Sequence, residues 1–331
     1  MSRSFTLALL FFALAVFATE ADAQRYIKEQ RYGSVGVSVG AMNYFGDIVP
    51  EPDFTSLRFK STRPTIGLSY AHRLGPHIAV RGAFNWGRII GDDAVSASAN
   101  EGENLGRYKR NLSFRNDIKE LSAVAVFDLL ENRRSYRLRP DFVPYAFLGV
   151  AVFHHNPKAY YENGSRPGLD PASDIPTGWY ELQPLGTEGQ FAGDAGTYPA
   201  PYKRLQIAIP FGLGARYKIN TRLDISLEVS WRKTFTDYLD DVSTSYVDKA
   251  LFLSDYAGVN DKASAILSDR SAESGFDTVE DPSGTVYDVV PGYGSSVNTS
   301  RGGDSSNDWY ITTNLTLSYI VPPRIRSPKF R

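Results

Sequence analysis

Residues 222–235 alternate between apolar and polar side chains almost without a break. The apolar set is Leu223, Ile225, Leu227, Val229, Trp231 and Phe235, and the polar set is Asp224, Ser226, Glu228, Ser230 and Arg232. Because successive side chains of a strand point to opposite faces, this run predicts a β-strand with one apolar and one polar face. It exceeds the usual globular strand of about 5–6 residues and fits a tilted membrane-spanning strand of roughly 9–11.

The same alternation recurs along the chain between turn residues. It predicts seven further strands, at residues 34–41, 65–72, 78–86, 119–129, 142–154, 205–219 and 308–321. Eight is the smallest common strand number for a single-chain outer-membrane barrel, and an even number places both termini on one side. The fold class predicted is therefore all-β: an eight-stranded antiparallel transmembrane β-barrel with long extracellular loops.

The lengths of the connections support this arrangement over a soluble sandwich. Those after the second, fourth and sixth strands are short or modest, and those after the first, third, fifth and seventh are long. Short periplasmic turns and long outer loops alternate in such barrels. The last long connection, about 237–307, is rich in Ser, Gly and Asp and lacks periodicity, which predicts a mobile segment. Pro210 interrupts the sixth strand, where we expect a bulge beside Gly212 and Gly214.

The ends of the chain divide it into three parts. Residues 1–23 have a basic start at Arg3, an apolar core and an Ala-Asp-Ala site before Gln24, which predicts a secretory signal peptide. Residues 24–321 form the predicted barrel, and residues 322–331 a basic periplasmic tail. We expect the mature chain to be integral to the outer membrane of a Gram-negative bacterium, with both termini periplasmic.

Charge and cysteine content exclude several classes of function. The chain has 36 basic and 37 acidic residues, and removing Arg3, Glu20 and Asp22 with the signal peptide leaves equal numbers. This balance predicts no nucleic-acid binding, which needs a basic surface. The absence of cysteine excludes disulfides, thiolate metal sites and a cysteine nucleophile.

Charged residues occur at inward-facing positions of the predicted strands. They include Arg81, Glu120, Arg216, Glu228 and Arg232. An eight-stranded barrel has an interior that side chains just fill, and an unpaired buried charge is costly. We therefore expect a network of ion pairs that plugs the lumen, and the alternative is a small passive channel.

Two further kinds of site are alternatives to a purely structural role. His154 and His155 at the outer end of the fifth strand are candidates for an enzyme acting on lipid, although neighbouring strand residues face opposite sides. Oxygen-rich groups at Asp237, Asp240 and Asp241 and at Asp304, Asn307 and Asp308 are candidates for calcium at the barrel mouth. No serine is marked as a nucleophile, and Asp and Asn are ordinary turn residues. The prediction is therefore a protein without catalytic activity, cofactor or metal.

Several sequence blocks resemble one family. Gly-Ala-Met-Asn-Tyr-Phe-Gly-Asp-Ile at 40–48 is similar to the Gly-x-x-Asn-Tyr-(Leu/Phe)-Gly-Asp signature of PorG-like outer-membrane barrels of the type IX secretion system. Blocks at 144–150, 155–159, 182–190, 209–212 and 236–243 continue the match in the same order. The residues of the two signature turns are Asn43, Tyr44, Phe45, Gly46, Asp47, Asp237, Tyr238, Asp240 and Asp241. In physical terms, they cap strands and organise the outer loops.

The resemblance implies a scaffold rather than an enzyme. PorG-like proteins are thought to seat a periplasmic ring of PorK-like lipoprotein and PorN-like subunits against the outer membrane. The partner surface this implies comprises the connections at 73–77, 131–141 and 219–222 and the tail at 322–331, with outer-membrane lipid around the barrel. Its candidate residues are Arg133, Arg134, Arg137, Arg139, Arg324 and Arg326. Such basic segments can steer an acidic partner.

Overall fold

The computed structural model of the chain describes most of the predicted barrel. The described residues are 31–48, 61–97, 102–132, 135–166, 174–192, 197–248, 251–252, 261–274, 278–280, 286–288, 300–303 and 307–322. The predicted signal peptide and nearly all of the basic tail lie outside them. So do four residues of the predicted partner surface, Arg133, Arg134, Arg324 and Arg326, and one residue of the calcium alternative, Asp304.

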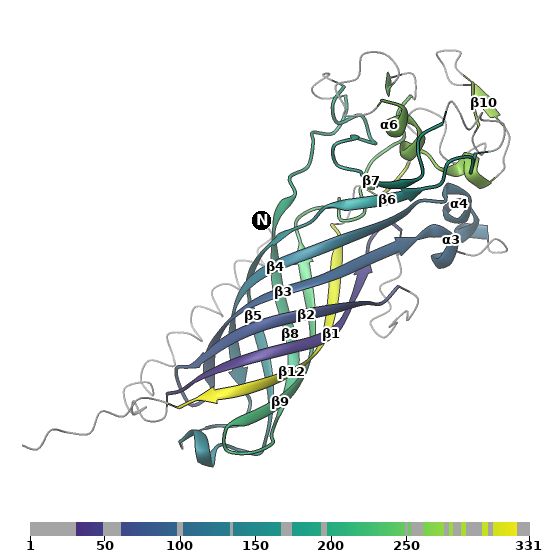
Figure 1. The fold of residues 1–331 in the computed structure, drawn as a ribbon. Coiled ribbons are helices and arrows are strands. Elements are labelled where there is room, and N and C mark those ends of the chain that lie inside the picture. The colour runs from purple at the N-terminus through teal and green to yellow at the C-terminus, as the bar shows by residue number, and fades with distance from the viewer. Residues whose placement is uncertain are drawn as a thin grey trace, which may run out of the picture.

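Eight long strands form one closed antiparallel barrel (Figure 1). They are β1 (Gly33–Phe45), β2 (Arg63–Arg73), β3 (Ile78–Asp92), β4 (Ser113–Asp128), β5 (Phe142–His154), β8 (Leu205–Lys218), β9 (Leu223–Thr234) and β12 (Trp309–Val321). The order around the barrel is β3-β2-β1-β12-β9-β8-β5-β4, and β3 also pairs with β4, which closes the ring. Each strand predicted from the sequence overlaps one of these, so the predicted fold class is confirmed.

The exterior of the barrel is apolar along its length. Exposed outward residues include Val35, Val37, Val39, Ile66, Leu68, Phe84, Leu121, Val150, Leu213, Leu227, Leu315 and Leu317. A protein in water rarely exposes an apolar patch beyond a few hundred Å². A closed sheet satisfies its own backbone hydrogen bonds and therefore tolerates lipid. This is a transmembrane barrel.

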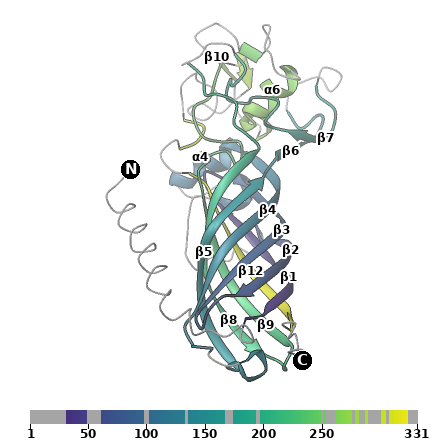
Figure 2. The same ribbon diagram turned by 90° about the vertical axis from the view of Figure 1, so that its left-hand side faces the viewer.

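The connections divide between the two ends of the barrel. At the end that we call the short-turn end, residues 74–77, 129–141 and 219–222 join the strands, and the second of these contains a 3₁₀ helix, η2 (Tyr136–Leu138). Gly33 of β1 lies opposite Val321 of β12 at this same end. The described parts of the other four connections lie at the opposite end, called the long-loop end (Figures 1 and 2).

The long connections contain several further elements, which together with their loops we call the cap. β6 (Pro157–Tyr161) pairs with the beginning of β4 and β7 (Gly178–Glu181) pairs with β6, so the sheet extends beyond the barrel. The other elements are α3 (Asp93–Ser96), α4 (Gly102–Arg110), α6 (Asp261–Ser268), η3 (Ser271–Ser274), β10 (Thr278–Glu280) and β11 (Val286–Asp288). Within the described ranges, no helix is long and apolar enough to cross a membrane.

The prediction of a mobile connection at 237–307 is wrong for its described parts. Leu239, Val242 and Leu267 are buried in the same hydrophobic cluster as Phe153 and Tyr310 of the barrel. Each such buried side chain contributes about 1.5–3 kcal/mol. The segment has no periodicity because its apolar residues fill gaps between other loops and do not line one face of an element.

The predicted bulge at Pro210 is also wrong. β8 keeps one register against β5, with Leu148 opposite Phe211 and Ala151 opposite Ala208, so no residue is inserted. Between these pairs the β5–β8 ladder is interrupted, whereas Pro210 stays in register with Arg232 of β9. Proline has no N–H, and the local gap in the ladder accommodates that missing donor.

Candidate functional site

The middle of the lumen is crossed by an ion pair between opposite walls. Arg81 on β3 donates to Glu228 on β9, with Nη2 to Oε2 at 2.9 Å. The hydroxyl of Tyr145 on β5 donates to the other carboxylate oxygen of Glu228 at 2.7 Å. Arg81 also lies over the ring of Phe147, 4.9 Å from its centroid. Three walls of the barrel are thereby joined by charge-assisted bonds, which are about twice as strong as neutral ones.

A second polar layer lies nearer the long-loop end. Arg232 on β9 donates from Nε to Oε2 of Glu120 on β4 at 3.0 Å. Glu120 also accepts from Tyr310 at 2.7 Å and from Asn85 at 3.0 Å. Arg232 donates in addition to Thr312 at 2.5 Å. The carboxylate and the guanidinium are both almost fully buried, and the bonds from four strands satisfy them.

A third layer closes the short-turn end of the lumen. Asp128 at the end of β4 accepts from Arg73 of β2 and from Arg216 of β8. Arg139 forms an ion pair with Asp224 of β9 and donates to the carbonyls of Asn220 and Thr221. Arg216 is therefore paired with Asp128, and not with another member of the predicted lumen set.

The space left between these layers is small. Three cavities in the lumen have volumes of about 50, 30 and 10 Å³. One probe sphere of water occupies about 10–15 Å³. The two larger cavities are lined by serine, threonine and charged side chains together with apolar ones such as Val124 and Val126, and each has room for a few water molecules. Arg81 lines both of the larger cavities and lies between them.

At the mouth of the barrel, the two signature turns meet. The hydroxyl of Tyr44 lies 2.6 Å from Oδ2 of Asp240 and 2.9 Å from Oδ1 of Asp308. The other oxygen of Asp308 accepts the backbone N–H of Leu239 at 2.8 Å. We call Tyr44, Asp240 and Asp308 the carboxyl latch. It joins β1, the connection after β9 and the start of β12, which are far apart in the sequence.

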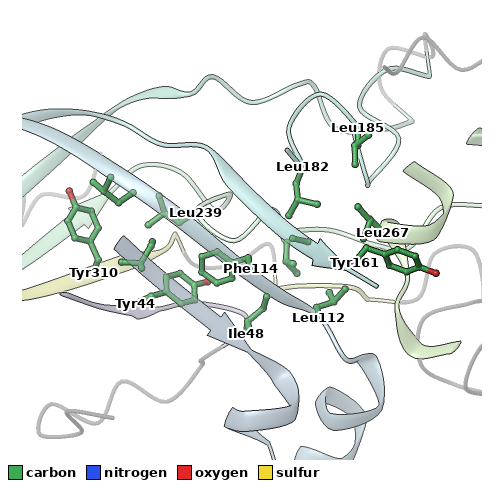
Figure 3. Packing of buried hydrophobic residues seen from close by; sticks show 14 of the residues in the cluster. Tyr44, Ile48, Leu112, Phe114, Tyr161, Leu182, Leu185, Leu239, Leu267 and Tyr310 are labelled. Carbon is green, nitrogen blue, oxygen red and sulfur yellow. The ribbon is translucent and has the colours of Figure 1, made fainter. Parts of the chain in front are cut away.

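Apolar residues surround Tyr44, the tyrosine of the carboxyl latch (Figure 3). Phe114 of β4 contacts the ring of Tyr44 edge to face, with centroids 4.9 Å apart. Leu239, Ile48 and Leu112 belong to the same cluster. This environment disfavours charge, and burial is the main reason why the pKa values of Asp240 and Asp308 are raised well above the ordinary value for aspartate. Repulsion from Asp47 raises the pKa of Asp240 further, and repulsion from Asp240 raises that of Asp308.

The other residues of the first signature turn surround this position. Asn43 is buried on β1 opposite Ile311, and Phe45 lies opposite Trp309. Asp47 accepts the backbone N–H of Gly303 at 3.1 Å. Burial raises its pKa to about 6, although Arg110 and Arg301 favour the charged form. Gly46 lies against Tyr44 and Asp308, and a Cβ there would overlap both side chains.

Two buried arginines hold the cap together. Arg110 of α4 forms a bidentate pair with Asp93 of α3, both distances being 2.7 Å, and also donates to the carbonyl of Arg301. Arg301 donates to Glu188 at 2.8 Å and to the carbonyl of Asp241 at 2.5 Å. Glu188 further accepts from Ser243 and Thr244. The block at 182–190 is thus bonded to the second signature turn.

The remaining residues of the second signature turn have partners of their own. Asp241 accepts from Thr187 at 2.5 Å and from Tyr202 at 2.6 Å, and burial raises its pKa to about 6. Asp237 accepts from Ser243 at 2.7 Å. The ring of Tyr238 stacks on Tyr202, with centroids 4.7 Å apart. Asp237, Asp240 and Asp241 therefore bond to different groups. Among the described residues, no three His, Cys, Asp or Glu side chains are arranged to hold a metal ion.

The two adjacent histidines lie on opposite sides of the chain. His154 is exposed on the outer wall, whereas His155 is buried and stacked on Tyr202. A ring nitrogen of His155 lies 3.2 Å from the carbonyl of Lys203, and burial lowers the pKa of His155 to about 4. The pair cannot act on one substrate from these positions.

The two described arginines of the predicted partner surface differ in exposure. Arg137 of η2 is exposed, and its guanidinium contacts the hydroxyl of Tyr136 at 3.2 Å. Arg139 departs from the prediction, since it is buried against Asp224 inside the short-turn end. Sequence alone carries no signal for this difference, because both arginines belong to the same basic run.

Comparison with known proteins identifies the family. The pattern of the family described as "Domain of unknown function (DUF6089)" matches residues 7–173, half of the chain, and the chain belongs to this family. No curated protein matches the sequence.

Several solved structures are similar in coarse outline. They include Ail, the attachment invasion locus protein of Yersinia pestis, crystallised with the heparin analogue sucrose octasulfate (8% identity, TM-score 0.36, 88% of this chain and 99% of that chain). OprG of Pseudomonas aeruginosa is similar at 9% identity and TM-score 0.34 over 89% of this chain and 99% of that one. A major outer membrane protein of Thermus thermophilus is similar at 12% identity and TM-score 0.34 over 87% and 99%. The strand pairings described above, and not these likenesses, establish the barrel.

Proposed function

We propose that this protein is a non-enzymatic barrel of the outer membrane that serves as a scaffold in type IX protein secretion, anchoring a periplasmic ring of PorK-like lipoprotein and PorN-like subunits. The observation that carries the scaffold role is the filled lumen. The layers at Arg81–Glu228, Arg232–Glu120 and Arg73–Asp128–Arg216 cross the interior in succession. A barrel closed in this way provides a rigid membrane anchor and offers no wide passage.

The secretion role rests on the resemblance of the sequence blocks to PorG-like barrels. Those blocks meet in the cap, where Tyr44 contacts Asp240, Thr187 contacts Asp241 and Glu188 contacts Ser243. In this proposal the cap holds the loops in one shape on the outer side. The short-turn end, which carries the exposed Arg137, faces the periplasmic ring.

The experiment is capture of the tagged barrel from outer membranes in mild detergent, after chemical crosslinking, with mass spectrometry of the proteins recovered. Stoichiometric recovery of the ring lipoprotein and its partner is expected. The variant Arg133→Glu, Arg134→Glu and Arg137→Glu is expected to lower that recovery at least about tenfold, since charge reversal repels an acidic partner. The matched control reverses three lysines at the long-loop end: Lys109, Lys203 and Lys233.

Recovery of the barrel alone, with crosslinking included, would overturn the proposal. A second measurement separates a scaffold from an enzyme. His154→Ala and His155→Gln, the latter keeping a polar side chain in the buried position, should leave secretion unchanged in a scaffold. Loss of secretion in both variants, with the barrel folded and the ring still bound, would instead favour catalysis at this rim.

A further inference from the structure

One side of the outer wall carries a row of polar and basic residues at the long-loop end. On neighbouring strands, Trp86 of β3 lies opposite Lys119 of β4, and Lys119 lies opposite His154 of β5. These strands lie side by side on the face turned to the reader in Figure 2, with β6 above them. Lys119 and His154 are exposed, so the row points away from the barrel.

More cations surround this row. They are Arg88, Arg115, Lys158 and Arg204, and the carboxylates among them are Asp117 and Glu181. Arg88 is paired with Asp117, and both Lys158 and Arg204 are paired with Glu181. No described carboxylate lies within 4.0 Å of Lys119. The surface, which we call the basic rim, therefore has an excess of positive charge.

The basic rim lies at the boundary of the apolar belt. The next outward positions toward the short-turn end are Leu121, Val152 and Ile207, which lie opposite one another across β4, β5 and β8 and are exposed. Trp86 is exposed beside Lys119, as expected of an aromatic at the membrane interface. The cations of the basic rim therefore lie at the depth of the lipid headgroups, directly beyond the part of the wall that contacts the acyl chains.

Arg115 connects the cations of the rim to the aromatic residues above it. Its guanidinium lies over the ring of Trp179 of β7, with Cζ 3.5 Å from the centroid. Its Nε is buried and makes no hydrogen bond within the described chain. The exposed rings of Tyr160 and Trp179 stand beside one another above the rim. Aromatic rings and cations therefore form one continuous outward surface from β3 to β7.

The opposite wall differs. At the long-loop ends of β1, β9 and β12, the corresponding register positions are Phe45, which is buried, Lys233 and Trp309. Lys233 lies over the ring of Trp309, 5.4 Å from its centroid, and is the one cation among these three positions. Among the described residues, these three positions carry one cation, fewer than the basic rim on the side of β3, β4, β5 and β8.

We propose that the basic rim binds the phosphorylated headgroup of an anionic lipid, whose acyl chains lie against Leu121, Val152 and Ile207. Charge complementarity and position argue for this occupant. A phosphate accepts several hydrogen bonds from arginine and lysine, and each basic residue near an anionic membrane surface strengthens attachment. The row adjoins the exposed apolar positions Leu121, Val152 and Ile207 on the same wall, and a lipid, which joins a phosphate to acyl chains, fits both parts at once. The inference rests on the membrane-embedded barrel of the proposed function and not on its ring partners.

The test is native mass spectrometry of the whole purified protein in detergent, titrated with phosphatidylglycerol or with phosphatidylcholine of the same acyl chains. Wild type is expected to retain the anionic lipid at least about tenfold more strongly. The variant Lys119→Gln, Lys158→Gln and Arg204→Gln should lose that preference. The control, Arg137→Gln, Lys218→Gln and Arg222→Gln, removes the same charge from the short-turn end and should keep it.

Equal retention of both lipids by wild type would overturn the inference and leave the rim to an acidic protein partner. An undiminished preference in the rim variant would overturn it as well. Resistance of each variant to sodium dodecyl sulfate before heating shows that the barrel has folded. Since no ring protein is present, failure here is distinguishable from failure of the capture experiment.

Discussion

The guanidinium of Arg232 and the carboxylate of Glu120 meet across the lumen, with Nε 3.0 Å from Oε2, although β9 and β4 are not neighbours in the barrel. Both side chains are almost fully buried. Removing one partner leaves the other charge unpaired in a medium of low dielectric constant, which is the costly case for a buried ion pair.

We expect Glu120→Gln to lower the free energy of unfolding by about 3–5 kcal/mol. Replacing both residues by apolar ones, Glu120→Leu with Arg232→Met, should restore most of that loss because no charge is then buried. The measurement is the denaturant midpoint in detergent micelles. The exposed pair Arg88–Asp117 provides the control, since Asp117→Asn should cost less than about 1 kcal/mol. Equal losses at the two pairs would contradict this account.

A filled lumen also predicts the electrical behaviour of the barrel. The wild-type protein in a planar bilayer should give no discrete conductance steps, because the cavities of about 50 and 30 Å³ hold only a few water molecules and the ion-pair layers lie between them. Replacing Arg81, Glu120, Glu228 and Arg232 by serine empties two layers and should produce small steps. Stable steps in wild type would refute the sealed lumen and favour the passive channel.

The sequence predicts the barrel well because its strands obey a strict local rule. Each wall residue faces either lipid or the lumen, so the period of two is visible in every strand. The pairing of lumen charges follows no local rule, because Arg81 meets Glu228 at a separation of 147 residues. The strand pattern places Asp224 on the polar face but does not indicate that it pairs with Arg139. The contributions of Asp128, Arg73 and Tyr310 to the layers could not be assigned from that pattern either.

The cap was harder to predict for a different reason. Its contacts depend on single residues in irregular loops, such as Tyr44 with Asp308 at a separation of 264 residues. Leu112 precedes β4, and Phe114 lies in the first part of β4, beyond the apolar belt. In that part of the strand the outward positions are charged, so an apolar residue no longer indicates the lipid-facing side. The signature turns themselves were the available signal. The Asn-Tyr-Phe-Gly-Asp run and the Asp-Asp pair indicate that each turn organises the outer loops, but nothing in the sequence indicates that the two turns contact each other.

The carboxyl latch predicts a dependence of stability on pH. The folded-state pKa values of Asp240 and Asp308 lie well above the unfolded value, and that of Asp47 is about 6. A carboxyl group with a raised pKa binds more protons in the folded state, so its contribution to the free energy of unfolding falls as pH rises above about 4, by up to about 1.4 kcal/mol per pH unit. His155, with a folded pKa of about 4, acts in the opposite direction below pH 6.5.

A comparison of variants separates these effects. Denaturant midpoints of wild type and Asp308→Asn at pH 5 and pH 8 share the contribution of His155. The variant removes one of two neighbouring carboxylates, so Asp240 ionises more easily and the loss of stability between pH 5 and pH 8 should shrink. Asp141→Asn at the exposed short-turn end is the control and should change nothing. An identical pH dependence in wild type and Asp308→Asn would show that the latch does not titrate in this range.

Gly46 gives the sharpest test of the contact between the signature turns. A Cβ at this position would overlap the carboxylate of Asp308 and the hydroxyl of Tyr44, both of which are buried. Gly46→Ala must therefore displace one of them, which costs about 1–3 kcal/mol for overpacking and a similar amount for a lost buried hydrogen bond. Gly75→Ala is the matched control, because no atom lies within 4 Å of its added Cβ.

The two glycine variants should differ in where they act. Gly46→Ala is expected to loosen the cap, measured as faster hydrogen exchange of the backbone amide of Leu239, which donates to Asp308. Exchange in the walls of the barrel, for example at Val37 and Leu317, should stay slow, since these strands pair independently of the cap. If Gly46→Ala exchanges like Gly75→Ala throughout, the latch does not hold the cap. Tyr44→Phe removes the shared hydroxyl without adding volume, so faster exchange in that variant as well would assign the effect to the hydrogen bonds and not to crowding.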